Sequence, residues 1–157
     1  MEKNKKLIPG LPTGFEDRWD KKLYLKKKLL SLIEENFIRY GFEPLETPSF
    51  EISENIGSFL ADDDSNPMSD VFTFNDGEKN ITLRYDLSSP LARFVAQNNQ
   101  QLPLPYKRYA IQNVFRNEKA GNARYREFTQ ADCDIVGNVN PAQSNAELCN
   151  LIASTLI

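Results

Sequence analysis

Polar and apolar positions alternate with a period of two from residue 124 to residue 135, as in a β-strand whose two faces differ in character. One face would carry the even-numbered side chains, which are Arg124, Arg126, Phe128, Gln130, Asp132 and Asp134. The other face would carry Tyr125, Glu127, Thr129, Ala131, Cys133 and Ile135. A strand buried on one side normally has apolar residues there and polar residues outside. The even face is unusual because it runs from cationic through aromatic to anionic.

This strand is predicted to be the second arm of a β-hairpin, whose first arm follows the segment Pro103–Pro105. A turn near Gly121 would bring the even-numbered residues of both arms onto one surface, and a slip of two residues would not change which face is which. The predicted opposed pairs are Glu118–Arg124, Arg116–Arg126 and Gln112–Gln130.

Two stretches of apolar residues with roughly helical spacing predict two long helices. The first begins at Asp17, as its N-cap, and ends at Tyr40, where Gly41 stops it. Its apolar positions are Trp19, Leu23, Leu29, Leu30, Ile33 and Phe37. The second spans residues 141–156, after Asn140. Its apolar positions are Ala142, Ala146, Leu148, Leu151, Ile152 and Leu156.

Shorter elements complete the predicted pattern. Residues 42–50 are predicted to be a strand, which the prolines at 44 and 48 confine to a sheet edge or a subunit boundary. Residues 71–74 and 81–85 are predicted to form a hairpin, and Ser89–Pro90 to begin a helix that ends near Asn98. The polar stretch 53–70 is predicted to be a mobile loop. The fold class is therefore α+β, with an antiparallel β-sheet flanked by helices in one domain.

Composition limits the classes of protein that the chain can represent. Its 157 residues are 40% hydrophobic, which is enough for one core. No apolar run approaches the roughly 18 residues of a membrane span, and residues 1–6 are followed by Pro9 and Gly10 rather than by an apolar segment. We therefore expect no membrane span, no signal peptide and a cytoplasmic location. The net charge of −3 argues against a dedicated nucleic-acid module. The lysines of the first long helix would form a solvated face or, alternatively, contact RNA phosphates; they are Lys21, Lys22, Lys26, Lys27 and Lys28.

The chain contains no histidine and only two cysteines, Cys133 and Cys149, which removes most metal and nucleophile chemistry. A zinc site needs about four Cys, His or carboxylate ligands, or three with an open position, and a Ser–His or Cys–His mechanism needs a histidine. We expect no metal site and interpret Cys133 as a packing residue on the inward face of its strand. The acidic run at residues 62–64 is the one alternative metal site, but it lacks alternating ligands and a glycine turn.

The even face of the hairpin would suit a ligand with phosphates at one end, a flat ring in the middle and an ammonium or imidazole group at the other. That description fits an aminoacyl-adenylate. Guanidinium groups gathered on one face are costly unless an anion neutralises them, and Phe128 and Gln130 extend the same face. The alternative is that Glu118 and Glu127 form ordinary ion pairs with these arginines, since such exposed pairs are common and weak.

A second candidate group lies where the strand 81–85 gives way to a helix. Asp86 and Ser88 stand at this boundary, which is a common position for side chains that contact ligands. The alternative is structural: Asp86 would be a turn residue, and Ser88 or Ser89 a helix cap.

The hairpin resembles motif 2 of class II aminoacyl-tRNA synthetases, and specifically the histidyl-tRNA synthetase family. The segment Leu83–Arg93 is similar to the histidine-binding segment of that family, in its Tyr-Asp variant. The segment Gly41–Pro48 resembles, more weakly, motif 1, which builds the dimer interface. The resemblance covers essentially the whole chain and implies the class II catalytic fold.

For ATP, the resemblance implies roles for four residues. Arg116 would bind the α-phosphate and act as the catalytic residue, while Glu118 would contact the adenine amino group. Phe128 would stack on the adenine ring, and Arg124 would lie towards the terminal phosphates. Mg²⁺ would accompany ATP, without a metal site of the protein's own.

For the amino acid, the resemblance implies that Gln130, Asp86 and Ser88 hold the amino group and backbone of L-histidine. Asp134 would accept a hydrogen bond from the imidazole N–H. Aspartate is one methylene shorter than the glutamate that the family can have at this position.

The resemblance further implies histidine–tRNA ligase activity, with tRNA(His) as a partner and a homodimer formed through the motif 1 region. Residues 1–157 would be the N-terminal portion of the catalytic domain, with motif 3 and the anticodon-binding domain absent from this chain. Because residue 157 lies within an apolar helix, we expect a fragment that cannot complete aminoacylation alone. One alternative is the synthetase-like regulatory subunit of ATP phosphoribosyltransferase, and another is a generic nucleotide-binding α+β module.

Overall fold

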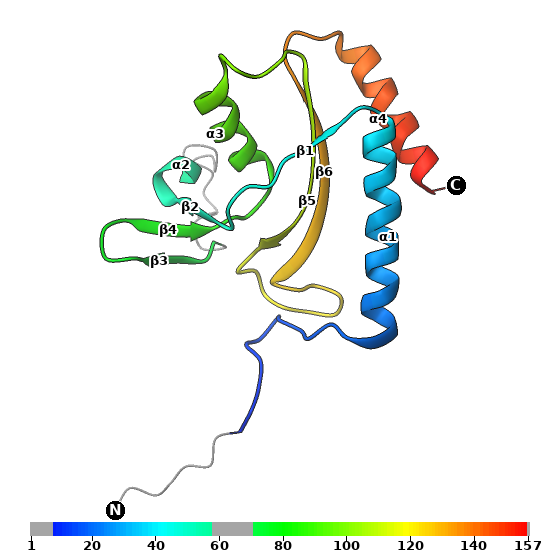
Figure 1. The fold of residues 1–157 in the computed structure, drawn as a ribbon. Coiled ribbons are helices and arrows are strands. Elements are labelled where there is room, and N and C mark those ends of the chain that lie inside the picture. The colour runs from blue at the N-terminus through cyan, green and yellow to red at the C-terminus, as the bar shows by residue number, and fades with distance from the viewer. Residues whose placement is uncertain (1–7, 58–70, 157) are drawn as a thin grey trace, which may run out of the picture.

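A long antiparallel hairpin forms the centre of the computed structural model, which describes residues 8–57 and 71–156 (Figure 1). Its arms are β5 (Tyr106–Phe115) and β6 (Glu127–Val136), and Gln112 lies opposite Gln130 as predicted. The two-residue strand β1 (Glu43–Pro44) pairs in parallel with β5 at the edge of this sheet. Most of the predicted loop 53–70 lies outside the described residues. The acidic run 62–64 and the segment 1–6 lie wholly outside them.

Two helices cover one face of the hairpin (Figure 1). They are α1 (Asp20–Arg39) and α4 (Pro141–Leu156). The buried residues of this layer are Phe37, Phe42, Tyr109 and Leu151. Odd-numbered strand residues, including Cys133, pack against them, which confirms the predicted inward face. Burial is the main reason that the pKa of the Cys133 thiol is raised, as suits a packing cysteine.

The start of α1 differs from the prediction, whereas its end agrees with it. The helix begins at Asp20 rather than after Asp17, because the Arg18 guanidinium donates a hydrogen bond to the carbonyl of Glu127 and keeps the preceding chain extended. At the other end, Gly41 has φ +77°, a conformation that favours glycine. The amides of Gly41 and Phe42 reach back to carbonyls of the last turn, so the predicted glycine stop is confirmed.

The predicted strand 42–50 is instead divided between two sheets, with Pro48 in the irregular segment between the parts. Its first part is the edge strand β1, as the prolines required. Its last residue begins β2 (Phe50–Ile52), which joins a second antiparallel sheet in the order β2–β4–β3. There, β3 (Thr73–Asn75) and β4 (Asn80–Leu83) form the predicted hairpin. The short helix α2 (Ser53–Gly57) falls within the stretch predicted to be a loop.

The second sheet and α3 (Ser88–Asn98) lie on the opposite side of the central hairpin from α1 and α4 (Figure 1). Here Leu87, Ala110 and Val114 are buried, and Phe128 packs against them. The even face is therefore partly covered by the chain that leads into α3. The structure confirms the α+β class and places the even face between two layers.

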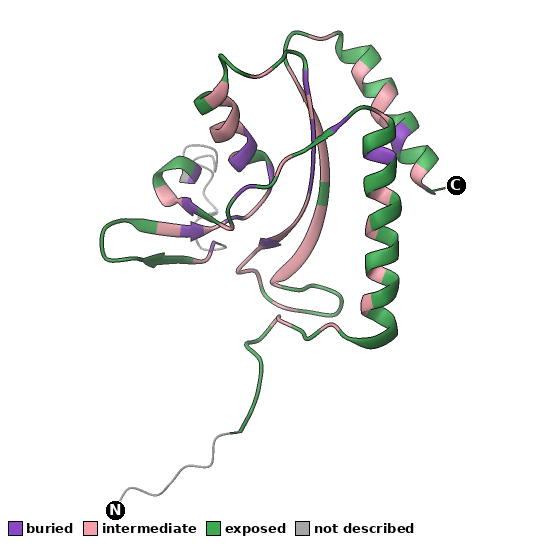
Figure 2. Ribbon diagram, viewed as in Figure 1, coloured by how far each residue is buried: buried purple, intermediate pink, exposed green. Residues whose placement is uncertain are grey.

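Several apolar helix positions predicted to face the core are exposed. On α1, Phe37 is buried, but Leu29 and the adjoining Trp19 are exposed; on α4, Leu151 is buried, but Ile152 and Leu156 are exposed. Figure 2 shows that most of the surface of α1 is exposed in this chain. The periodicity identified the helices correctly but overestimated how much of each is covered by the described residues.

We expect Gly14→Ala to destabilise the fold at the turn end of the hairpin. Gly14 has φ +86°, and its carbonyl accepts a hydrogen bond from the amide of Arg126. A Cβ atom there would lie 2.7 Å from Arg126 Cγ and 3.1 Å from Ala120 Cβ. The backbone conformation alone costs roughly 1–2 kcal/mol for a residue with a side chain. Thermal unfolding of full-length variants checks this, with Gly10→Ala as the control, because a Cβ at Gly10 meets nothing within 4 Å. An unchanged melting temperature in Gly14→Ala would contradict the prediction.

Candidate functional site

The Arg116 guanidinium lies between two aromatic rings at the end of β5. Its Cζ is 4.5 Å from the centroid of the Tyr85 ring and 5.0 Å from that of Phe128. Its Nε donates a hydrogen bond of 3.3 Å to the carbonyl of Tyr85. Arg116 and Phe128 therefore project from the same face of the hairpin, as the alternation predicted, and the contacts with the rings fix the orientation of the guanidinium.

A cavity of about 330 Å³ opens beside this arginine. Its lining residues are Arg116, Glu118, Ala123, Arg124, Tyr125 and Phe128. The structure thus brings together all four residues predicted from the resemblance to bind ATP. The cavity combines an aromatic wall, two guanidinium groups and one carboxylate, which is the set of groups that a purine nucleotide with its phosphates would contact.

The alternative interpretation of this face was that Glu118 and Glu127 form ordinary ion pairs with its arginines. The structure shows only one of these two residues paired with an arginine side chain. Glu118 Oε2 lies 2.5 Å from Arg124 Nη2, and Glu118 Oε1 accepts a long hydrogen bond from the Tyr85 hydroxyl. The Arg124 side chain is 66% exposed, so this pair contributes little to stability. Glu127 instead accepts a hydrogen bond from the Asn113 side chain, away from the arginines. One predicted ion pair is therefore present, and the pairing of Glu127 with an arginine side chain is wrong.

Further along the same face, the predicted histidine-binding residues of β6 form a polar row. Gln130 Nε2 donates a hydrogen bond of 2.7 Å to Asp132 Oδ2, which shows that these side chains share one side of the strand. Phe128 and Asp134 are six residues apart, or roughly 20 Å at about 3.3 Å per residue. The two predicted subsites therefore lie along one surface.

Asp134 is held beside a buried cation. Arg108 Nη2 lies 2.8 Å from Asp134 Oδ2, and the Arg108 side chain is 1% exposed. Burial raises the pKa of the Asp134 carboxyl; Arg108 lowers it in part, while Asp132 raises it further. The charge state of Asp134 therefore depends on a neighbour that the sequence interpretation did not include in the site.

Asp86 and Ser88 lie at the start of α3. Asp86 Oδ1 accepts a hydrogen bond of 2.9 Å from the amide of Ser89, so the carboxylate caps this helix. The helix begins at Ser88, and the predicted N-cap role of Ser89 is therefore wrong. Ser88 is exposed. Asp86 Oδ2 accepts a long hydrogen bond of 3.4 Å from Ser89 Oγ, so the present contacts of Asp86 are those of a turn and cap residue.

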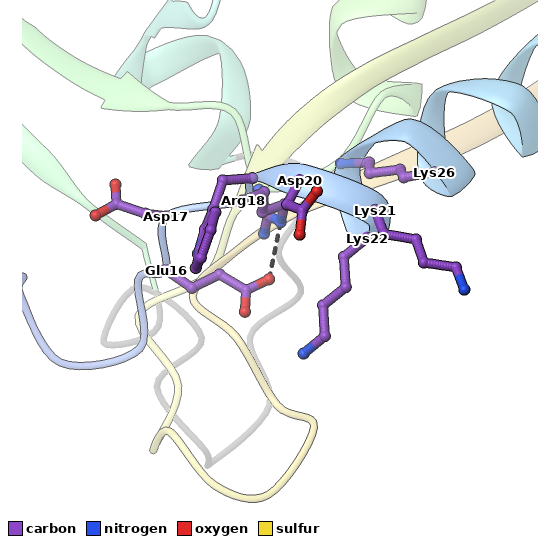
Figure 3. Close-up of a pocket in the computed structure, with 8 residues that line it drawn as sticks. Glu16, Asp17, Arg18, Asp20, Lys21, Lys22 and Lys26 are labelled. Carbon is purple, nitrogen blue, oxygen red and sulfur yellow. Dashed lines mark hydrogen bonds and ion pairs between the residues drawn. The ribbon is translucent and has the colours of Figure 1, made fainter.

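A larger cavity, of about 420 Å³, lies at the start of α1, away from the row of predicted residues (Figure 3). Figure 3 shows Glu16 and Asp17 on one side of it and Lys21 and Lys22 on the other, with Glu16 paired to Arg18. Lys26 donates a hydrogen bond of 2.5 Å to Thr129 Oγ1, and burial lowers its pKa. For Lys26 the predicted solvated face is wrong, because it anchors α1 to β6, whereas Lys21 and Lys22 are exposed.

The structure adds three residues to the predicted set: Tyr85, Arg108 and Asp132. Tyr85 lies within the segment already predicted to contact a ligand, and Asp132 lies on the predicted face of β6. Arg108 could have been found by extending the even-numbered face along β5 beyond Gln112. Its contact with Leu87, 21 residues earlier in the chain, could not be read from any local pattern.

Within 8–57 and 71–156, no group of three or more histidine, cysteine or acidic side chains is arranged to hold a metal ion. In that part of the chain, no helix combines the length and apolar character needed to cross a bilayer.

The family model for histidyl-tRNA synthetase matches residues 14–157. A histidine–tRNA ligase of Pelagibacter ubique strain HTCC1062 is 82% identical over 157 residues, which are all of this chain and 34% of that protein. Among solved structures, histidyl-tRNA synthetase from Nostoc sp. PCC 7120 superimposes with a TM-score of 0.73 at 28% identity, covering 92% of this chain and 34% of that one.

A further solved structure is described as an ATP phosphoribosyltransferase regulatory subunit/histidyl-tRNA synthetase from Bacillus halodurans. It superimposes with a TM-score of 0.79 at 25% identity over 99% of this chain and 39% of that chain. The chain spans about a third of the length of the curated relatives that it matches.

Proposed function

Because the chain belongs to the histidyl-tRNA synthetase family, we propose that its hairpin face binds ATP and L-histidine and joins them as histidyl-adenylate in the full-length protein. The observation that carries the proposal is the convergence of Arg116, Glu118, Arg124 and Phe128 on one cavity. Charging of tRNA(His), dimerisation through the motif 1 region and binding of Mg²⁺ with ATP belong to the same proposal.

The proposed chemistry needs no histidine side chain. The substrate carboxylate is already ionised near pH 7, so it attacks the α-phosphorus of ATP without a general base. The oxygen–phosphorus bond to the carboxylate forms as the bond to pyrophosphate breaks, and the leaving pyrophosphate takes the electron pair. Catalysis then depends on positioning and on neutralising the charge that develops on the phosphate.

Arg116 is suited to that task. Its planar guanidinium can donate to two phosphoryl oxygens at once, and the rings of Tyr85 and Phe128 already hold its plane in place. A group oriented before the substrate arrives stabilises the transition state without a reorganisation cost. Arg124, exposed at the mouth of the cavity, is proposed to meet the terminal phosphates.

Isotope exchange between pyrophosphate and ATP by the full-length protein tests the proposal. We expect exchange that requires both ATP and histidine and that no other amino acid supports at equal concentration. A protein that binds these ligands without exchange would be a regulatory relative instead. The match to a structure described by both names supports neither function over the other, and the assembled ATP cavity favours the ligase.

We expect Phe128→Leu to raise KM for ATP about tenfold and to leave KM for histidine within twofold. Leucine retains much of the packing against Leu87 and Val114 but removes the ring face, whose stacking with a base contributes about 1–3 kcal/mol. Exchange kinetics at saturating histidine measure the effect. Phe74→Leu is the control, because Phe74 is an exposed aromatic residue on β3. Equal KM values for ATP in the two variants would contradict the stacking role.

A further inference from the structure

Arg108 is a charged residue in a position where the fold needs only an apolar side chain. It lies in the middle of the central sheet with 0% of its surface exposed, on the same face of β5 as the buried Ala110 and Val114. Burying a guanidinium costs several kcal/mol unless the geometry of its partners is excellent. Well-packed apolar residues of similar volume often replace buried ion pairs without loss of stability. Packing alone therefore does not account for an arginine here.

The bonding of Arg108 is also incomplete. Nη2 donates a hydrogen bond of 2.9 Å to the carbonyl of Leu87. Among the described residues, Nε and Nη1 have no hydrogen-bond partner, and the 2.8 Å approach of Nη2 to Asp134 Oδ2 is not aligned as a hydrogen bond. A cation held this way stabilises the fold weakly but sets a strong local field. That field acts on Asp134.

Two contacts place Arg108 between the two segments proposed to hold histidine. In the strand register it lies directly opposite Asp134. Its other partner, the Leu87 carbonyl, stands between Asp86 and Ser88. The Asp134 side chain is 35% exposed whereas that of Arg108 is 1% exposed, so the carboxylate faces outward and the guanidinium lies behind it.

We propose that Arg108 is a positioning residue for histidine recognition: it holds Asp134 Oδ2 from behind, so that Oδ1 accepts the imidazole N–H of the substrate. This inference rests on the proposed function and adds a residue to its amino-acid subsite. Arg108 itself does not touch the substrate. It also links β6 to the residues that lead into α3, which fixes the distance between the two segments proposed to bind histidine.

The electrostatics of Asp134 supports this role. Burial disfavours the charged form of this carboxyl, and Asp132 adds a like charge beside it. Arg108 opposes both effects, because its positive charge favours the charged form of Asp134. A protonated carboxyl carries a proton on one oxygen and has less capacity to accept a hydrogen bond than the anion. Loss of the guanidinium would therefore weaken histidine binding through Asp134, without any direct contact between Arg108 and the ligand.

The test is exchange kinetics of full-length variants with histidine and ATP varied separately. We expect Arg108→Met to raise KM for histidine at least tenfold while KM for ATP stays within twofold. Arg108→Lys, which keeps a cation, is expected to raise KM for histidine three- to fivefold. If Arg108→Met does not fold, Arg108→Lys alone decides, and a change below twofold in KM for histidine overturns the proposal.

Arg84→Met is the matched control, because Arg84 is also buried but, within residues 8–57 and 71–156, its side chain bonds only backbone carbonyls, those of Asn113 and Thr47. It is expected to lower stability without separating the two KM values. In an Asp134→Ala background, Arg108→Met should add less than a twofold further rise in KM for histidine, since the carboxylate it positions is gone. Independent, multiplying effects would overturn the proposal.

These outcomes are distinct from failure of the proposed function. If the wild-type protein shows no histidine-dependent exchange, the ligase proposal fails and this inference fails with it. If the wild type exchanges normally but Arg108→Met raises both KM values equally, or neither, only the role of Arg108 is overturned.

Discussion

Replacing Arg116 with alanine in the full-length protein is expected to slow histidyl-adenylate formation by about 10²–10³-fold. Loss of one preoriented donor to a developing anion costs roughly 3–4 kcal/mol in comparable sites. Arg116 is such a donor, because its guanidinium lies against two aromatic rings and beside the cavity. Pyrophosphate exchange at saturating ATP and histidine measures the effect.

A second substitution at Arg116 separates the contribution of the planar guanidinium donors from that of the positive charge. Arg116→Lys keeps the positive charge but loses the planar pair of donors, so it is expected to recover only part of the rate. Arg39→Ala, in the last turn of α1, is the control, and exchange should be unchanged in it. A loss below tenfold in Arg116→Ala would remove Arg116 from the catalytic role and would leave the cavity without its proposed function.

The assembly of the cavity beside Arg116 could be predicted from sequence because the pairing of two strands in a β-hairpin determines which side chains share a face. In an antiparallel pair, one register assignment determines the face of every residue. The pair Gln112–Gln130 is present in the structure as predicted, and Arg116 and Phe128 therefore lie on the same side. The alternation predicted the common face of these residues, whereas the roles that the resemblance implies for them stay predictions.

Other features depended on contacts that are distant in sequence. The start of α1 moved to Asp20 because Arg18 bonds the carbonyl of Glu127, 109 residues later in the chain. The strand predicted over residues 42–50 is divided between two sheets, because its first part pairs with β5 and its last residue, as the start of β2, pairs with β4. These pairings cannot be read from the residues of the segment itself. The contact of Arg108 with Leu87 belongs to the same class. Local periodicity identifies elements, and the packing of separate elements decides their ends and the charge states within them.

Asp134→Ala is expected to raise KM for histidine by roughly 10- to 150-fold and to change KM for ATP by less than threefold. A hydrogen bond to a charged group contributes about 1.5–3 kcal/mol, and its loss leaves a partner unsatisfied in a partly buried site. The site that bonds the imidazole would then also discriminate less against amino acids without that group. Exchange kinetics with histidine and ATP varied in turn measure both constants.

The position of Asp134 on the hairpin explains why the effect should be selective. Asp134 lies six residues along β6 from Phe128, beyond Gln130 and Asp132, so its removal leaves the proposed ATP cavity and its lining intact. Asp76→Ala is the control, since the Asp76 carboxylate accepts hydrogen bonds from the amides of Glu78 and Lys79 in the turn between β3 and β4. Equal losses for histidine and ATP would mean that Asp134 supports the sheet through its pairing with Arg108 rather than the substrate. A selective loss for histidine would place the amino acid at the anionic end of the face, with ATP at the cationic end.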